Sequence, residues 1–103
     1  MDKKATILVV DDERGIRESF NMVLKEDFNV LLAETGKEAI DIFTETNIDV
    51  ILLDILLPDI NGLHLLEQLK SIDPNTEIIM VTAVKEIQTA VTAIKLGAYE
   101  YLI

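Results

Sequence analysis

The sequence predicts a single α/β domain with a doubly wound, five-stranded parallel sheet and helices on both faces. Short apolar runs of strand length alternate along the chain with segments whose apolar residues follow helical spacing. This alternation is typical of parallel strands joined by right-handed crossovers. The 103 residues, half of them apolar, are enough for one hydrophobic core and require no second domain.

The composition is strongly acidic and lacks cysteine. The chain has 19 Asp and Glu against 9 Lys and Arg, a net charge of -10. This charge argues against direct binding of nucleic acid or an anionic membrane, and it suits a cation or a basic partner. Without cysteine, disulfides and thiolate chemistry are excluded and a cytoplasmic location is expected. Asp11, Asp12 and Glu13 interrupt the first apolar run, so neither a signal peptide nor a membrane span is expected.

The first two strands and the helix between them follow from the apolar pattern. Ala5–Val10 is an apolar run that predicts a buried strand. The one-sided apolar spacing over about Arg14–Glu26 predicts an amphipathic helix, and the acidic segment before it lies at the helix's positive end. Phe28–Ala33 is less purely apolar and predicts a strand nearer an edge. Thr35 and Glu38 then have capping-box spacing, which predicts the start of the second helix.

The third strand ends abruptly on a carboxylate. Val50–Leu53 is wholly apolar and predicts a strand buried on both faces, so Asp54 lies at its carboxyl end. Pro58 prevents the strand from continuing, and Asn61-Gly62 marks a turn before the next helix. A carboxylate at the edge of a buried sheet suggests a functional role, and the alternative is an aspartate that caps a turn.

The remaining elements repeat the same alternation. Leucines at every third residue predict a helix that ends before Pro74, and a stop glycine closes the following helix. The predicted elements are a helix around Leu63–Leu69, a strand at Glu77–Val81, a helix around Ile87–Ile94 that stops at Gly97, and a strand at Tyr99–Ile103.

The relative apolarity of the strands predicts their order in the sheet. The strands that end at Asp11, Asp54 and Thr82 are the most apolar and should be central, with the other two as edges. This matches the flavodoxin-like order 2-1-3-4-5, in which ligands bind at the carboxyl ends of strands one and three. Asp11, Asp12 and Asp54 should therefore meet in one crevice.

Three converging carboxylates need a cation. At about 4 Å and an effective dielectric near 20, each like-charged pair costs about 4 kcal/mol. Hard oxygen ligands at a partly open site favour Mg²⁺, which keeps several waters and binds through one or two carboxylates. Taken alone, Asp11-Asp12 is more often a helix-capping pair than a metal site. Asp54 at the same crevice favours the metal site.

Several motifs together resemble the receiver domains of two-component response regulators, which have the chemotaxis-receiver fold. The resemblance covers the chain from about Thr6 to its end. It rests on the acidic pair after the first strand, on the aspartate after the third and on the residues that follow these positions: Asp11-Asp12, Asp54, Leu57-Pro58, Asn61-Gly62, Thr82, Gly97-Ala98 and Tyr101.

The resemblance implies a role for each of these residues. Asp54 would accept a phosphoryl group from the phosphohistidine of a sensor histidine kinase, without the chain being a turnover enzyme. Asp12 would bind Mg²⁺ directly, Asp11 largely through water, and Leu56 would contribute its backbone carbonyl. Thr82 would hydrogen-bond the phosphoryl oxygen and Tyr101 would change rotamer, although on their own they could be a satisfied buried threonine and an edge-strand aromatic.

Such receivers carry a lysine after the fifth strand and then a fifth helix. Here that lysine would lie just beyond Ile103, so the chain has neither feature. We expect residues 1–103 to be the N-terminal receiver domain of a longer bacterial protein with an output domain. The resemblance of Ala98–Ile103 to nitrogen-regulatory activators implies that this output is transcriptional. With one helix left to cover one sheet face, we expect self-association as a homodimer, exchange of elements between protomers, or loss of cooperative structure.

Three other functions share parts of this pattern. An FMN carrier has the same architecture, but Asp11-Asp12-Glu13 would repel the FMN phosphate. An aspartyl-phosphate hydrolase usually has a second acidic residue two positions after its nucleophile, where this chain has Leu56. A non-phosphorylated, receiver-like interaction module remains the main alternative, and the acidic triad argues against it. His64, the only histidine, is expected to lie on the surface.

Overall fold

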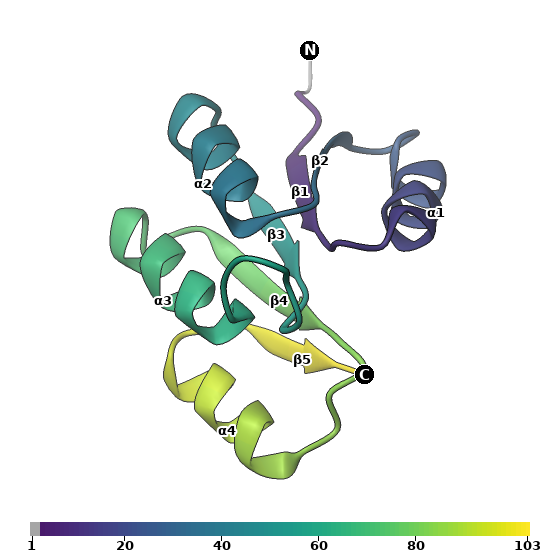
Figure 1. Cartoon of the computed structure of the whole chain (residues 1–103). Helices are drawn as coiled ribbons and strands as arrows, with labels where there is room; N and C mark the ends of the chain where they lie inside the picture. The colour runs from purple at the N-terminus through teal and green to yellow at the C-terminus, as the bar shows by residue number, and fades with distance from the viewer. Residues whose placement is uncertain (1–2) are drawn as a thin grey trace.

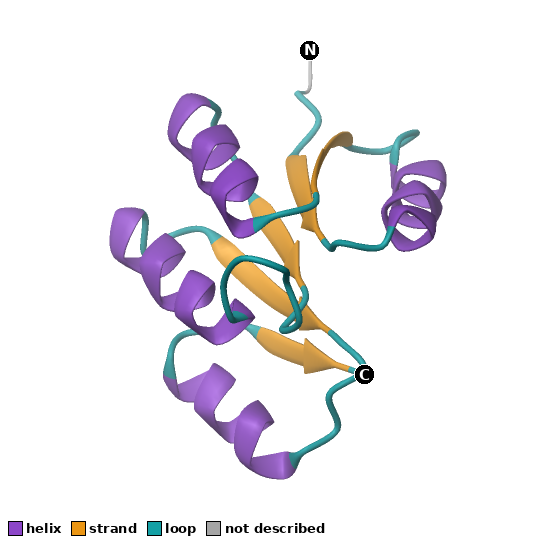
Figure 2. Cartoon of the chain, viewed as in Figure 1, coloured by secondary structure: helices purple, strands orange, loops and turns teal. Residues whose placement is uncertain are grey.

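The computed structural model describes residues 3–103 as a five-stranded parallel sheet with four helices (Figures 1 and 2). The strand order is β2-β1-β3-β4-β5, as the sequence predicts, with all neighbouring pairs parallel. The strands are β1 (Thr6–Val10), β2 (Asn29–Ala33), β3 (Val50–Leu53), β4 (Glu77–Val81) and β5 (Glu100–Leu102).

The helices divide unequally between the two faces of the sheet. Figure 1 shows α2, α3 and α4 side by side on one face, whereas α1 alone lies on the other, next to β1 and β2. The helices are α1 (Arg14–Leu24), α2 (Gly36–Glu45), α3 (Gly62–Ile72) and α4 (Ile87–Lys95). None of them, within the described part of the chain, combines the length and apolar character needed to cross a bilayer.

The core lies between the sheet and the three helices on its crowded face. Alternate residues of β3 and β4 point into it and are fully buried, and three leucines of α3 pack against them. These residues are Ile51, Leu53, Ile78, Met80, Leu65, Leu66 and Leu69. By contrast, α1 has no fully buried residue. The most tightly packed part of the domain is therefore the layer between the sheet and α2, α3 and α4.

The helix ends follow the local signals in the sequence. The Thr35 hydroxyl accepts a hydrogen bond from Glu38 N at 3.1 Å and caps α2, while the Glu38 carboxylate accepts from Glu34 N. The Asn61 side chain accepts from Leu63 N at 2.8 Å and caps α3. After α4, Gly97 has a φ of 108°, a conformation that favours glycine and ends the helix.

Strands β1 and β2 each start one residue later than expected, and larger differences occur at two other elements. Helix α1 ends at Leu24 rather than near Glu26, because Phe28 N turns back to the Leu24 carbonyl at 2.9 Å. Strand β5 covers three residues rather than five, because its ladder with β4 is only three pairs long. Neither difference moves a predicted site residue away from the carboxyl edge of the sheet.

Candidate functional site

Three aspartates converge at the carboxyl ends of β1 and β3. These strands are neighbours in register, with Val10 paired to Leu53, so the residues that follow them leave the sheet side by side. One carboxylate oxygen each of Asp11, Asp12 and Asp54 lies within 4.8 Å of the others. Parallel pairing thus brings together side chains that are more than forty positions apart in the chain.

The cluster carries negative charge that no ion pair within residues 3–103 offsets. Asp11 is only 7% exposed, Asp54 is half-buried and Asp12 is exposed. Burial raises the pKa of Asp11, and the charges of Asp54, Asp12 and Glu13 raise it further, against a hydrogen bond from Glu13 N at 2.9 Å that lowers it. Among residues 3–103, no Lys or Arg forms an ion pair with any of the three aspartates. This donor set fits a hard divalent cation.

Arg17 supports this site from α1, a role that the sequence did not reveal. Its Nη1 donates to the Asp11 backbone carbonyl at 2.9 Å, and its Nη2 lies 3.7 Å from a Glu34 carboxylate oxygen. The Arg17 side chain is only 15% exposed. It holds the segment after β1 in place without neutralising the carboxylates. In the sequence it resembles any polar residue of an amphipathic helix.

The loop after Asp54 folds back on itself before α3 begins. Gly62 N donates to the Ile55 carbonyl at 2.7 Å, and Leu56 and Asn61 form an isolated antiparallel bridge. The hydrogen bond of this bridge joins the neighbouring residues Ile55 and Gly62, so the N–H and C=O groups of Leu56 point away from Asn61. The Leu56 nitrogen lies 3.4 Å from Asp54 Oδ1 and donates to it. A side chain at Gly62 would overlap the Asp54 carbonyl, so this close approach requires glycine.

The two other predicted residues lie on the neighbouring strands at the same edge. Thr82 follows β4 and is buried, and its Oγ1 accepts a hydrogen bond from Val84 N at 3.3 Å. On β5, the Tyr101 hydroxyl donates to the Val84 carbonyl at 2.7 Å. Burial raises the pKa of Tyr101, and the charges of Asp54 and Glu86 add to this. Thr82 and Tyr101 thus bind the two backbone polar groups of the same residue: Thr82 binds the N–H of Val84, and Tyr101 binds its carbonyl.

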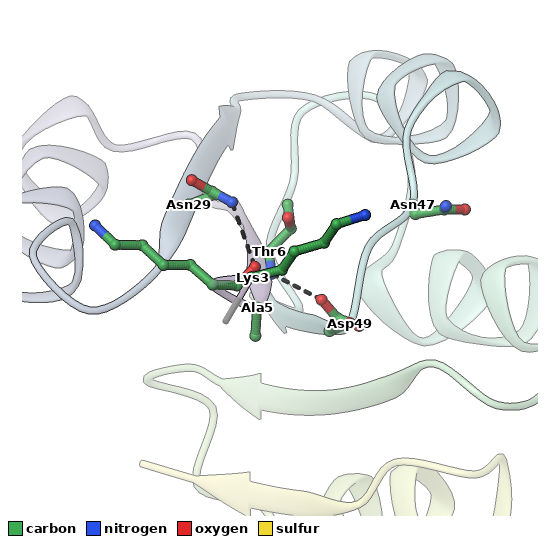
Figure 3. A pocket seen from close by; sticks show the side chains of 7 residues that line it. Lys3, Ala5, Thr6, Asn29, Asn47 and Asp49 are labelled. Carbon is green, nitrogen blue, oxygen red and sulfur yellow. Dashed lines mark hydrogen bonds between the residues drawn. The ribbon is translucent and has the colours of Figure 1, made fainter. Parts of the chain in front are cut away.

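A second pocket lies at the opposite edge of the sheet, and its described residues include a single carboxylate, Asp49. It lies at the amino ends of the strands, at the opposite edge from the carboxyl-end cluster, and Figure 3 shows hydrogen bonds to the chain at two of its polar side chains, Asp49 and Asn29. Thr6 N donates to Asp49 Oδ2 at 2.8 Å, and Asn29 Nδ2 donates to the Lys4 carbonyl at 3.4 Å. His64 is exposed on α3, as expected, and belongs to neither site.

Comparison with known proteins identifies the family. The family model for the response regulator receiver domain matches residues 7–103. Regulatory protein AtoC of Escherichia coli is 35% identical over 98 residues, which are 94% of this chain and 21% of AtoC. Sporulation initiation phosphotransferase F of Bacillus subtilis is 39% identical over 93 residues, which are 89% of this chain and 75% of that protein. The chain thus spans about a fifth of AtoC but most of the Bacillus protein.

A solved structure supports the same assignment. A response regulator protein from Burkholderia pseudomallei, crystallised with a phosphorylated aspartic acid, calcium ion and citrate, is 29% identical and superposes with a TM-score of 0.90. The match covers 96% of this chain and 59% of that one. Sequence, fold and strand order therefore agree, and the chain belongs to the family of two-component response regulator receiver domains.

Proposed function

We propose that this chain is a phosphoacceptor whose Asp54 receives a phosphoryl group from the phosphohistidine of a sensor histidine kinase. The observation that carries the proposal is the position of Asp54, half-buried at the end of β3 and beside two further carboxylates. An Asp54 oxygen forms the bond to phosphorus as the phosphorus–nitrogen bond breaks, and the electron pair of that bond returns to the imidazole. Mapping the adduct after exposure to a small phosphodonor tests the assignment.

Mg²⁺ is the metal that the cluster is proposed to hold. Asp12 and Asp54 would bind it directly, Asp11 largely through water, and Leu56 through the carbonyl of its outward-facing backbone. When bound, the ion offsets the charges of Asp54 and of the incoming phosphoryl oxygens. Asp11 is suited to an indirect role, because it is the most buried of the three and already accepts a hydrogen bond from Glu13 N.

Thr82 and Tyr101 are proposed to report the state of Asp54 through Val84. The Thr82 hydroxyl that would turn toward a phosphoryl oxygen now accepts from Val84 N, and the Tyr101 hydroxyl donates to the Val84 carbonyl. Moving Thr82 would release Val84 N and shift the carbonyl that holds Tyr101. The two side chains are therefore coupled through one backbone unit, which suits a conformational change at β5 and the segment leading to α4.

The partners follow from the proposed chemistry. A sensor kinase in the cytoplasm would supply the phosphoryl group, and an output domain outside the 103 residues, transcriptional in kind, would receive the signal. The chain spans 21% of AtoC, a protein described as regulatory. The net charge of -10 supports the view that this segment does not itself bind nucleic acid or an anionic membrane.

The phosphorylated form is expected to be long-lived. The residues two positions after Asp54 and Thr82 are Leu56 and Val84, and neither side chain can orient an attacking water. Replacing Leu56 by Asn and Val84 by Glu should accelerate loss of the phosphoryl group by roughly 10-fold or more, measured as the decay of radiolabelled protein. If the doubly substituted protein loses phosphate no faster, the role assigned to these positions is wrong.

We infer that two copies of the isolated 103-residue chain associate through the sheet face that α1 only partly covers. Within the described residues, β4 and β5 have no helix on this face in Figure 1, where Ile79 and Val81 are partly exposed and Leu102 is 46% exposed. The negative charge of each copy opposes association. Salt screens this repulsion, so the association should be stronger at high salt. Sedimentation at low and high salt, together with thermal melting, tests this. A strict monomer with a sharp, cooperative transition under both conditions would contradict it.

A further inference from the structure

The loop after Asp54 is attached to helix α2 by a side chain that no proposed chemical step uses. Asp59 Oδ1 accepts a hydrogen bond from Gly36 N at 2.8 Å, and Asp59 Oδ2 accepts from Lys37 N at 3.0 Å. We call these two bonds the Asp59 clamp. Both donors belong to the first turn of α2, where backbone N–H groups lack partners within the helix.

The clamp is charge-assisted at neutral pH. The hydrogen bonds from Gly36 N and then Lys37 N lower the pKa of Asp59 below its usual range, which favours the ionised carboxylate. The positive end of the helix dipole favours the same charge. The next amide, Glu38 N, bonds to Thr35 Oγ1 instead. The N-terminus of α2 is thus capped by Thr35, which immediately precedes the helix, and by Asp59, which lies in the loop after Asp54.

Close packing beside the clamp shows that the loop is docked on α2. A side chain at Gly36 would overlap Ile60 Cγ2, so Ile60 reaches the helix only because residue 36 is glycine. Ile60 in turn packs against the hydrophobic core. The helix is a firm support, because Ala39 and Phe43 on its inner face are buried. A loop fixed to this support has little freedom to move.

The loop transmits this restraint toward Asp54. Only two residues separate Asp59 from Leu56, and the bridge between Leu56 and Asn61 closes the segment between them. At its near end, Leu56 N–H lies 3.4 Å from Asp54 Oδ1. The far end of the loop is therefore held by α2, and the near end contacts the carboxylate that would be phosphorylated.

We propose that Asp59 is a positioning residue for the acidic site, because the Asp59 clamp holds the loop that places the Leu56 backbone beside Asp54. This inference rests on the proposed Mg²⁺-dependent function. Without the clamp, the loop must be ordered when the metal binds, and that ordering weakens binding. Residues that orient metal ligands without touching the ion typically affect affinity by about 10–100-fold. Asp59 acts only through the backbone of the loop, so we expect a smaller effect, about a 5–10-fold loss of Mg²⁺ affinity.

The test compares Asp59→Ala and Asp59→Asn with Thr35→Ala. Thr35 caps the same end of α2, and among residues 3–103 its side chain makes no hydrogen bond to the loop, so its loss weakens the helix without breaking the Asp59 clamp. The readouts are Mg²⁺ affinity by calorimetry, thermal stability, and hydrogen exchange of the Leu56, Leu57 and Ile60 amides in metal-free protein. Thr35→Ala controls for any general effect of destabilising α2.

The expected results separate the clamp from the helix cap. Asp59→Ala should bind Mg²⁺ about 5–10-fold more weakly, and the three loop amides should exchange about 10-fold faster. Asp59→Asn keeps one acceptor oxygen and should fall between Asp59→Ala and the wild type. Thr35→Ala should lower thermal stability while leaving Mg²⁺ affinity and loop exchange as in the wild type.

Two results would overturn the inference. One is unchanged loop exchange in metal-free Asp59→Ala, which would show that the clamp does not hold the loop. The other is an equal loss of Mg²⁺ affinity in Thr35→Ala and Asp59→Ala, which would reduce the role of Asp59 to helix stability. Failure of the wild type to bind Mg²⁺ would instead refute the proposed metal site, and the exchange data would still decide whether the clamp exists.

Discussion

Asp12→Ala is expected to reduce Mg²⁺ affinity by about 100-fold, whereas Asp11→Ala should reduce it by only about 10-fold. Asp12 is exposed beside Asp54 and can offer its carboxylate directly to the ion. Asp11 is buried, and one of its oxygens already accepts a hydrogen bond from Glu13 N. Calorimetric titration of the three proteins with Mg²⁺ measures the difference.

Glu13→Ala is the matched control for this comparison. It removes the same charge from the adjacent exposed position, and the Glu13 side chain makes no capping hydrogen bond to α1. Its Mg²⁺ affinity should stay within about 3-fold of the wild type, because the general field of one exposed charge is screened by salt. Equal affinities in the wild type and Asp12→Ala would refute the assignment of the metal site.

Asp54→Asn is expected to abolish modification by a small phosphodonor, a fall of at least about 100-fold in adduct yield. The amide retains the shape of the side chain but is a much poorer nucleophile than the carboxylate. Intact-protein mass spectrometry after incubation with phosphodonor and Mg²⁺ measures the yield. Asp27→Asn is a suitable control, because it removes one exposed carboxylate from the turn between α1 and β2, at the opposite edge of the sheet. An unchanged yield in Asp54→Asn would contradict the assigned role.

Local signals in the sequence were sufficient to predict the elements and their order. The apolar run Val50–Leu53 predicted a buried central strand, and its abrupt end placed Asp54 at the carboxyl edge. The capping spacing at Thr35 and the stop at Gly97 marked helix ends that the structure contains. Each of these features depends on residues within a few positions of one another, so periodicity and turn chemistry are enough to identify it.

Contacts between distant parts of the chain could not be predicted in this way. Asp59 bonds to the amides of Gly36 and Lys37, which lie 23 and 22 positions earlier, and its own neighbours in the sequence suggest only a turn. Arg17 looks like an ordinary polar residue of α1, yet it reaches the Asp11 carbonyl. Such contacts depend on how the helices and loops dock on the sheet, which the local pattern does not specify.

Locating the phosphoryl adduct shows whether Asp54 accepts the group with the help of a bound cation. The wild-type protein would be incubated with a small phosphodonor with and without Mg²⁺, trapped by borohydride reduction of the acyl phosphate, digested and analysed by mass spectrometry. We expect modification of Asp54 alone and only with Mg²⁺. Modification of another residue, or an equal yield at Asp54 without the metal, would contradict it.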